Sequence, residues 1–213
     1  MQIALWGATG TIGQRILQEA LDRGHAVRAA VRDPGRLTVS HPRLAVVRGD
    51  ALNPGEVAEA VRGCDAVVSA LGPGRGEPAE MLVTLNQRLV EGVRAAAVRR
   101  LIVVGGAGSL EVAPGVRLLD TPEFPAGWKA IAQAAADALA WYRREANDLE
   151  WTVMSPAAFI QPGQRTGHYR VGTDQLVTNE QGESRISAED FAVALLDELE
   201  RPRFIRRRFT VAY

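Results

Sequence analysis

The strongest constraint in this chain is a glycine-rich turn near its N-terminus, between an apolar segment and an amphipathic one. Residues 3–6 predict a buried strand, and Gly7, Gly10 and Gly13 follow with the spacing G-x-x-G-x-x-G. Gly7 can turn tightly because it has no Cβ, Gly10 lets the backbone approach phosphates, and Gly13 lets a helix pack closely. The first N–H groups of that helix would face an anion. The order strand, turn, helix predicts a dinucleotide-binding loop, with a purely structural turn as the alternative.

Strand and helix patterns alternate along the rest of the chain. Strands are expected at residues 27–31, 44–47, 66–69, 101–104, 151–155 and 209–212, and helices at 81–97, 126–145 and 191–200. Short runs of Val, Ile and Leu suit strands that are buried on both faces of a parallel sheet. The alternation predicts an α/β fold, namely a Rossmann-type doubly wound parallel sheet. The 213 residues suffice for one core, so we expect a single domain over 1–213 with a small C-terminal elaboration on the substrate side.

Two short patterns predict helix starts. Asn53 followed by Pro54 is typical of an N-cap and a first helical residue. Ser187-x-x-Asp190 resembles a capping box, with Asp in place of Glu, before the helix expected at 191–200.

Three irregular stretches interrupt the pattern, at about 72–80, 105–127 and 161–182. Each follows an expected strand directly or within a few residues. We therefore expect all three near the carboxyl edge of the sheet, where open α/β folds bind ligands. They would share one cleft on the substrate side, and the alternative is three plain surface loops.

The residue at the tip of the second expected strand indicates which nucleotide is bound. That position is Arg32, and Asp33 follows one step later. A guanidinium there can hold a 2′-phosphate, with Arg36 as a second contact, so we favour NADP(H) over NAD(H). The alternative is a solvated loop arginine. Asp50, beside Ala51, is placed to bond the adenine amino group or merely to cap a turn.

Several motifs appear in an order that resembles a known family. They are Gly7-Ala8-Thr9-Gly10-x-x-Gly13, Val31-Arg32-Asp33-Pro34, Gly49-Asp50, Asp65-Ala66-Val67-Val68-Ser69-Ala70-Leu71-Gly72, Gly105-Gly106-Ala107-Gly108-Ser109-Leu110, Ser155-Pro156-Ala157-Ala158-Phe159 and Arg185-Ile186-Ser187-Ala188-Glu189-Asp190-Phe191-Ala192. Together they resemble the atypical short-chain dehydrogenase/reductases. The best match is the bacterial NADH-flavin reductase group, which is related to biliverdin reductase B. The resemblance covers nearly the whole chain, and its later motifs are the most specific.

The resemblance implies a role for each matching residue. It assigns the pyrophosphate to the loop Gly7, Thr9, Gly10, Thr11, Ile12 and Gly13, the 2′-phosphate to Arg32, the nicotinamide ribose to Ala70, Leu71 and Gly72, and the carboxamide to backbone groups of Pro156, Ala157 and Ala158. Phe159 would lie close to the pocket. Ser109 matches the serine near the nicotinamide and the substrate.

The chain lacks the acid–base pair that is usual in the wider superfamily. In a Tyr-x-x-x-Lys motif the lysine lowers the tyrosine pKa so that the phenol can move a proton. The only lysine here is Lys129, and Pro125 stands four residues before it. This argues against the usual alcohol dehydrogenase, epimerase or dehydratase chemistry. The sequence also contains no P-loop, no nucleophile elbow and no persuasive metal site, and the three histidines are expected at the surface.

A planar acceptor such as FMN or FAD needs no strong general acid, because it can accept hydride directly from dihydronicotinamide. The sequence therefore predicts an NAD(P)H-dependent oxidoreductase that reduces a flavin or a similar small planar molecule. Ser109 would orient the acceptor, or it would only cap the turn after a strand. The rival hypothesis is a redox sensor that binds NAD(P) without turnover and acts through a protein partner.

Composition limits the partners and the compartment. The formal net charge is +0, which gives no electrostatic reason to expect nucleic acid or a membrane surface. We also expect no signal peptide. The single cysteine, Cys64, cannot form an internal disulfide and is expected to be buried, as fits a cytoplasmic protein. The expected assembly is a monomer or a small homo-oligomer.

Overall fold

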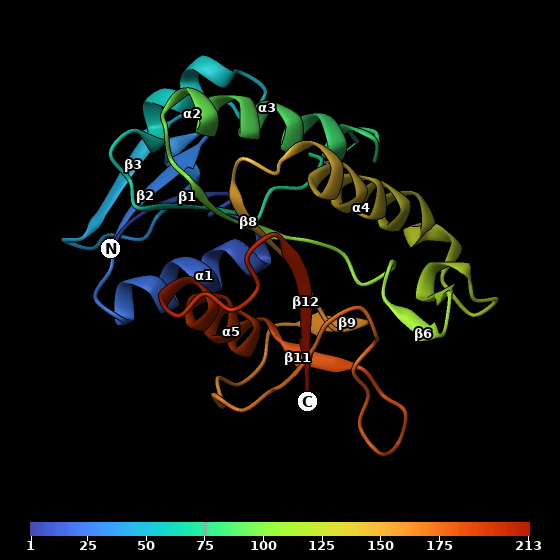
Figure 1. The fold of residues 1–213 in the computed structure, drawn as a ribbon. Coiled ribbons are helices and arrows are strands. Elements are labelled where there is room, and N and C mark those ends of the chain that lie inside the picture. The colour runs from blue at the N-terminus through green and yellow to red at the C-terminus, as the bar shows by residue number, and fades with distance from the viewer. Residues whose placement is uncertain (75) are drawn as a thin grey trace.

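An eight-stranded sheet crosses the middle of the computed structural model, which describes residues 1–74 and 76–213 (Figure 1). Arg75, within the stretch expected at 72–80, lies outside the described residues. From one edge to the other the sheet contains β10 (Arg170–Gly172), β12 (Arg207–Ala212), β8 (Glu150–Ser155), β5 (Arg100–Val104), β4 (Ala66–Ser69), β1 (Gln2–Trp6), β2 (Ala26–Val31) and β3 (Leu44–Arg48).

The strand order reverses at β1, which pairs with β2 on one side and with β4 on the other. All neighbouring strands of the sheet are parallel except β10 and β12, which are antiparallel. The predicted Rossmann-type doubly wound sheet is therefore confirmed, with one antiparallel strand added at an edge. In such a fold the crevice at the carboxyl ends of the strands, beside the reversal, is the expected ligand site.

Helices cover both faces of the sheet (Figure 1). One layer contains α1 (Thr11–Asp22) and α5 (Ala188–Glu200), and the other contains α2 (Pro54–Val61), α3 (Met81–Ala95) and α4 (Ala126–Glu145). Alternate residues of β1 enter the two cores, with Leu5 facing the α1/α5 layer and Trp6 the other. Two small pairs and two 3₁₀ turns lie outside the main sheet: β6 (Glu111–Ala113) with β7 (Val116–Arg117), β9 (Phe159–Gln161) with β11 (Arg185–Ser187), Pro34–Arg36 and Leu118–Asp120.

The two predicted helix starts have different outcomes. Asn53 caps α2 as predicted, and its side chain accepts from the N–H of Gly55 at 3.0 Å. Only half of the predicted capping box forms at α5: Ser187 Oγ accepts from the N–H of Asp190 at 2.9 Å. The N–H of Ser187 donates instead to the Tyr213 hydroxyl at 3.1 Å. The helix also begins at Ala188, three residues earlier than expected.

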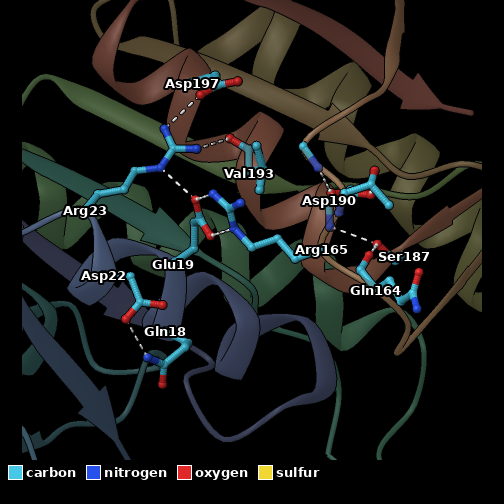
Figure 2. A network of polar contacts seen from close by, with 12 residues as sticks. Gln18, Glu19, Asp22, Arg23, Gln164, Arg165, Ser187, Asp190, Val193 and Asp197 are labelled. Atoms are coloured by element: carbon cyan, nitrogen blue, oxygen red, sulfur yellow. Dashed lines mark hydrogen bonds and ion pairs between the residues drawn. The ribbon is translucent and has the colours of Figure 1, made fainter.

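The Asp190 carboxylate holds part of the stretch expected at 161–182. It accepts from the N–H groups of Thr166 and Gly167 at 2.8 and 2.7 Å. Nearby, the Arg165 guanidinium donates twice to Glu19 of α1, at 2.7 and 2.8 Å (Figure 2). Residues 163–168, which we term the strap, thus lie across the α1/α5 layer. The expected shared cleft does not form: the cavity described below is lined by residues of the stretch 72–80 and by none of 105–127 or 161–182.

Two side chains bear on the expectations from composition. Cys64 is buried, as expected. The expectation that every histidine lies at the surface is wrong for His25, which is buried and bonded to Glu200 at 2.8 Å. Glu200 is the last residue of α5, so His25 is held against the end of that helix. Within the described ranges, no helix is long and apolar enough to cross a membrane.

Candidate dinucleotide-binding site

A cavity of about 420 Å³ opens at the carboxyl ends of β1, β2, β3 and β4. It lies where the strand order reverses, which is the expected place for a nucleotide. Many of the predicted cofactor-binding residues line it: Gly7, Thr9, Gly10, Arg32, Asp50, Ala51, Ala70, Leu71 and Gly72. The other predicted residues do not: Thr11, Ile12, Gly13, Ser109, Pro156, Ala157, Ala158 and Phe159. The cavity therefore contains residues predicted for the adenosine, the phosphates and the nicotinamide ribose, but not those predicted for the carboxamide or for the acceptor.

The backbone of the glycine turn requires two of its glycines. Gly7 has a φ of +81°, and a Cβ there would lie 2.3 Å from the carbonyl oxygen of Ala70. A Cβ on Gly13 would lie 2.0 Å from the carbonyl oxygen of Gly7. In both cases the obstacle is rigid backbone, so these glycines are needed to form the turn itself. Gly13 thus allows α1 to pack against the loop that precedes it.

Gly10 differs from its two neighbours in the motif. A Cβ at Gly10 would meet only the carbonyl oxygen of Gly7, at 3.4 Å, which is ordinary contact. Gly10 is the N-cap of α1 and offers no side-chain cap, and the first turn of α1 contains no acidic residue. The orphan N–H groups of that turn are therefore available to an anion, and the helix dipole favours one. A Cβ is therefore compatible with the protein's own packing at this position, and the need for glycine to admit the pyrophosphate stays a prediction.

At the tip of β2 the structure separates the two candidate charges. Asp33 Oδ1 accepts from the N–H of Gly35 at 3.1 Å and caps a 3₁₀ turn. Arg32 lines the cavity, and its side chain is 63% exposed. The acidic side chain is thus engaged locally, while the guanidinium faces the site. Arg48, at the end of β3, borders an adjoining hollow with Arg32 and adds positive charge that the sequence analysis did not identify.

Glu77 is a second residue that the sequence analysis missed. It lines the cavity, and its carboxylate accepts from the N–H of Gly74 at 2.6 Å and from Arg32 at 3.3 Å. The Gly74 bond, followed by the Arg32 guanidinium, lowers the pKa of Glu77 below its usual range. No local motif marks this residue, because its partner is 45 positions away in the chain.

Asp50 caps a turn, which is the structural alternative to adenine binding. Its Oδ1 accepts from the N–H of Leu52 at 3.0 Å, which is a turn cap. Its N–H donates to Glu56 at 2.8 Å. Asp50 also lines the cavity, so the turn cap does not exclude the predicted adenine contact.

Trp6 forms part of the cavity wall beside the glycine turn. Its side chain is 1% exposed, and the ring lies where Gly49 leaves room, because a Cβ there would be 3.0 Å from the indole Cη2. The indole N–H has no hydrogen-bond partner among the described residues. The strand pattern explains why Trp6 is buried, but nothing in that pattern indicates that this residue lines the cavity.

Ser109 lies outside the cavity and is bound by a buried arginine. Arg208 of β12, whose side chain is 3% exposed, donates to Ser109 Oγ at 2.9 Å. Arg208 also donates to Asp174, which accepts in addition from Arg143 at 2.9 Å. The Ser109 hydroxyl therefore joins the segment after β5 to β12. An arginine cannot accept a hydrogen bond, so the hydroxyl proton remains available for another acceptor.

The segment predicted to meet the carboxamide has several of its backbone groups already bonded. The N–H of Ala158 donates to Ser184 Oγ at 3.1 Å, and the N–H of Phe159 donates to the Ser184 carbonyl at 3.0 Å. The Pro156 carbonyl accepts from Thr210 at 3.4 Å. The Phe159 side chain is 72% exposed. Its role beside a nicotinamide stays a prediction.

None of the three tyrosines resembles a catalytic phenol. Tyr142 is fully buried on α4 and donates to Asn86 at 2.9 Å, and burial raises its pKa. Tyr169 donates to Asp197, and burial raises its pKa as well. Tyr213 donates to Asp190 at 2.7 Å. Over residues 1–74 and 76–213, no group of three or more His, Cys, Asp and Glu side chains could hold a metal ion.

Comparison with known proteins identifies the class to which this fold and this cavity belong. The profile of a family described as NAD(P)H-binding matches residues 7–202. The chain belongs to this NAD(P)H-binding family of oxidoreductases.

Individual relatives are similar over their whole length. The uncharacterized protein YwnB of Bacillus subtilis (strain 168) is 41% identical over 214 residues, which cover 99% of this chain and 98% of the relative. A solved structure from Burkholderia pseudomallei, named "putative exported protein", is 48% identical with a TM-score of 0.91, and 100% of both chains is covered. A "putative NADH-flavin reductase" from Streptococcus pneumoniae TIGR4 is 34% identical with a TM-score of 0.87, over 100% of this chain and 99% of that one.

Proposed function

We propose that this protein is an NADPH-dependent reductase that transfers hydride directly to a small planar acceptor, with a free flavin as the first choice. The observation that carries the proposal is the cavity at the strand reversal. Its glycine turn opens onto the uncapped N-terminus of α1, and Arg32 stands at the tip of β2. The similarity to a protein named an NADH-flavin reductase supports the choice of acceptor.

The residues around the cavity fit an NADPH molecule. The first-turn N–H groups of α1 would hold the pyrophosphate, and Gly10 leaves the space that it needs. Arg32 would pair with the 2′-phosphate, because a guanidinium matches phosphate geometry. Leu71 and Gly72 would line the path toward the nicotinamide end. Bound NADPH would supply the hydride, and the flavin would take its proton from water.

Direct transfer is consistent with what the chain lacks. No Tyr-x-x-x-Lys pair is present in the sequence, and each tyrosine is engaged elsewhere. Hydride transfer between two planar rings mainly requires proximity, alignment and exclusion of bulk water. We propose that Ser109, whose hydroxyl proton is left available by Arg208, orients the acceptor without acting as an acid.

The redox-sensor alternative gains no support from the aromatic side chains. In that alternative, Trp128 or Phe124 would fill the cleft. Trp128 is instead 66% exposed, and neither residue lines the cavity. The exposed Trp128 side chain therefore does not supply the filled cleft that the sensor alternative requires.

The decisive experiment measures NADPH oxidation with FMN, FAD, riboflavin and a quinone offered separately. We expect turnover with at least one flavin, and none with the Gly10→Val variant, which serves as the control for adventitious reduction. Tight NADPH binding by the wild type without turnover on any acceptor would contradict the proposal and favour the sensor. Ser109→Ala should retain activity, with a loss of roughly tenfold to a hundredfold.

A further inference from the structure

An ion pair crosses the mouth of the cavity. Arg32 Nη1 at the tip of β2 lies 3.3 Å from Glu77 Oε1, in the segment that follows β4. In the sheet, β1 lies between β4 and β2. The pair therefore connects the segments that follow the two neighbours of β1, and both residues line the cavity together with Gly7.

The segment after β4 is built to hold a carboxylate at this point. Glu77 accepts from the N–H of Gly74 at 2.6 Å, and its own N–H donates to the Gly74 carbonyl at 3.0 Å. A Cβ on Gly74 would lie 2.9 Å from Glu77 Oε1, so the missing side chain makes room for the carboxylate. The contact is thus fixed from the Glu77 side by backbone, and the guanidinium completes it.

Arg32 is also the group that we assign to the 2′-phosphate. One guanidinium cannot present the same N–H groups to a carboxylate and a phosphate, and the two anions repel each other at close range. Asp33, the nearest other acid in the sequence, is occupied by the N–H of Gly35. Glu77 is therefore the described carboxylate that meets Arg32 at the site.

We propose that Glu77 is a specificity-determining residue that competes with the 2′-phosphate of NADPH for Arg32. This inference rests on the role of Arg32 in the proposed function. The 2′-phosphate of NADPH brings a second anion to the guanidinium, and Glu77 opposes it by occupying Nη1 and by charge repulsion. NADH, which has no 2′-phosphate, can bind without this competition. Glu77 thus reduces the preference for NADPH over NADH that Arg32 would give if it were unpaired.

The test uses two small probes that differ only by the 2′-phosphate, namely adenosine 2′,5′-bisphosphate and 5′-AMP, in calorimetric titrations. Glu77→Gln removes the charge but keeps an oxygen that can accept from the Gly74 N–H. It should tighten binding of the bisphosphate by roughly threefold to tenfold and change 5′-AMP binding by less than about twofold. Glu80→Gln, the same change three residues away, is the matched control and should alter neither affinity.

A second variant tests the Arg32–Glu77 contact by changing Gly74, which lies against the Glu77 carboxylate. Gly74→Ala should push the flexible Glu77 carboxylate away from Arg32, because the new Cβ would overlap it. Its effect should have the same direction as that of Glu77→Gln. In an Arg32→Ala background, Glu77→Gln should tighten binding of the bisphosphate by less than about twofold, because the guanidinium for which the two anions compete is absent.

Three results would overturn the inference. They are equal tightening of both probes by Glu77→Gln, no change in either, and weaker binding of the bisphosphate. Failure of the cofactor assignment looks different, because the wild type would then bind both probes equally and Arg32→Ala would remove no preference. These titrations need no turnover, so an absence of flavin reduction would leave their interpretation unchanged.

Discussion

The two ends of helix α1 serve different purposes. At its N-terminus, Gly10 leaves backbone N–H groups without a side-chain cap, and the surrounding space opens into the cavity. Near its C-terminus, Glu19 is bound by Arg23, the C-cap residue of the helix, and by Arg165 of the strap (Figure 2). The first end leaves its backbone N–H groups without a side-chain cap beside the cavity, and the second binds distant segments of the chain.

The comparison separates two kinds of structural information. The ligand end depends on backbone geometry and on residues that are adjacent in sequence, so a seven-residue motif predicts it. The other end depends on side chains that meet across 146 residues in the case of Arg165 and Glu19, and 174 in the case of Arg23 and Asp197. A change at the first end should therefore affect binding and spare stability, and a change at the second should do the reverse.

The largest expected effect comes from Gly10→Val. The side chain would occupy the space of the pyrophosphate, so NADPH binding should weaken by at least a hundredfold, about 2.7 kcal/mol. The free energy of unfolding should change by less than about 1 kcal/mol, because the site tolerates a Cβ. Calorimetry and urea unfolding measure the two quantities. Gly127→Ala, in open space at the start of α4, is the control. If Gly10→Val binds NADPH with wild-type affinity, the glycine motif is only a structural turn.

Glu19→Gln should have the opposite effects, because it should lower stability and spare NADPH binding. The Glu19 side chain is 5% exposed, and its loss of charge leaves Arg23 and Arg165 without their shared partner. We expect the free energy of unfolding to fall by about 2 to 3 kcal/mol, with NADPH affinity unchanged. Glu91→Gln removes an exposed pair with Arg88 and should cost less than about 0.5 kcal/mol. If Glu19→Gln costs no more than this control, the buried network does not stabilise the fold.

Arg32→Ala should weaken NADPH binding by about 1 to 3 kcal/mol and leave NADH nearly unchanged, because only NADPH presents a 2′-phosphate. Isothermal titrations with both nucleotides provide the comparison. Arg88→Ala, on the exposed face of α3, should change neither affinity. An equal loss for both nucleotides would show that Arg32 does not discriminate between them.

The smallest effect concerns pH. Arg165, with Arg23, lowers the pKa of Glu19 from its usual value of 4.5, despite the opposing effect of burial. The lowered pKa stabilises the folded protein fully above pH 4.5, and this contribution is lost as pH falls through the lower, folded-state value. The stability difference between wild type and Glu19→Gln should thus be constant near neutrality. Below pH 4.5 it should shrink, by at most about 1.4 kcal/mol per pH unit. A constant difference down to pH 3 would contradict the assignment.

The fold was largely predictable from the sequence because its signals are local. Buried runs such as 66–69 and 101–104 specify central parallel strands. The antiparallel β10 has only three residues in an irregular stretch, so no periodicity marks it. The strap escaped prediction because Asp190, expected to complete a capping box, binds Thr166 and Gly167 instead. The Asp190 carboxylate thus has its partners in a distant segment and not in its own helix cap.

The candidate site was predictable at its phosphate end and at the tip of β2. Arg32 and Gly10 line the cavity where their motifs place them. Glu77 and Trp6 were missed, because their relation to the cavity depends on how β4 and β1 lie side by side, which spacing along the chain does not encode. The acceptor end rests on family resemblance, and Ser109 has a structural partner in Arg208 that no sequence pattern links to it.

The buried indole of Trp6 gives this protein a built-in optical reporter. Trp6 lines the cavity, and its indole N–H has no partner in the described part of the chain. Because the side chain is buried, its emission should be shifted to the blue relative to that of the exposed Trp128. A reduced nicotinamide absorbs in the range where indole emits. Binding should therefore quench this fluorescence by energy transfer, and the quenching should be smaller in Trp6→Phe, so occupancy could be followed without any label.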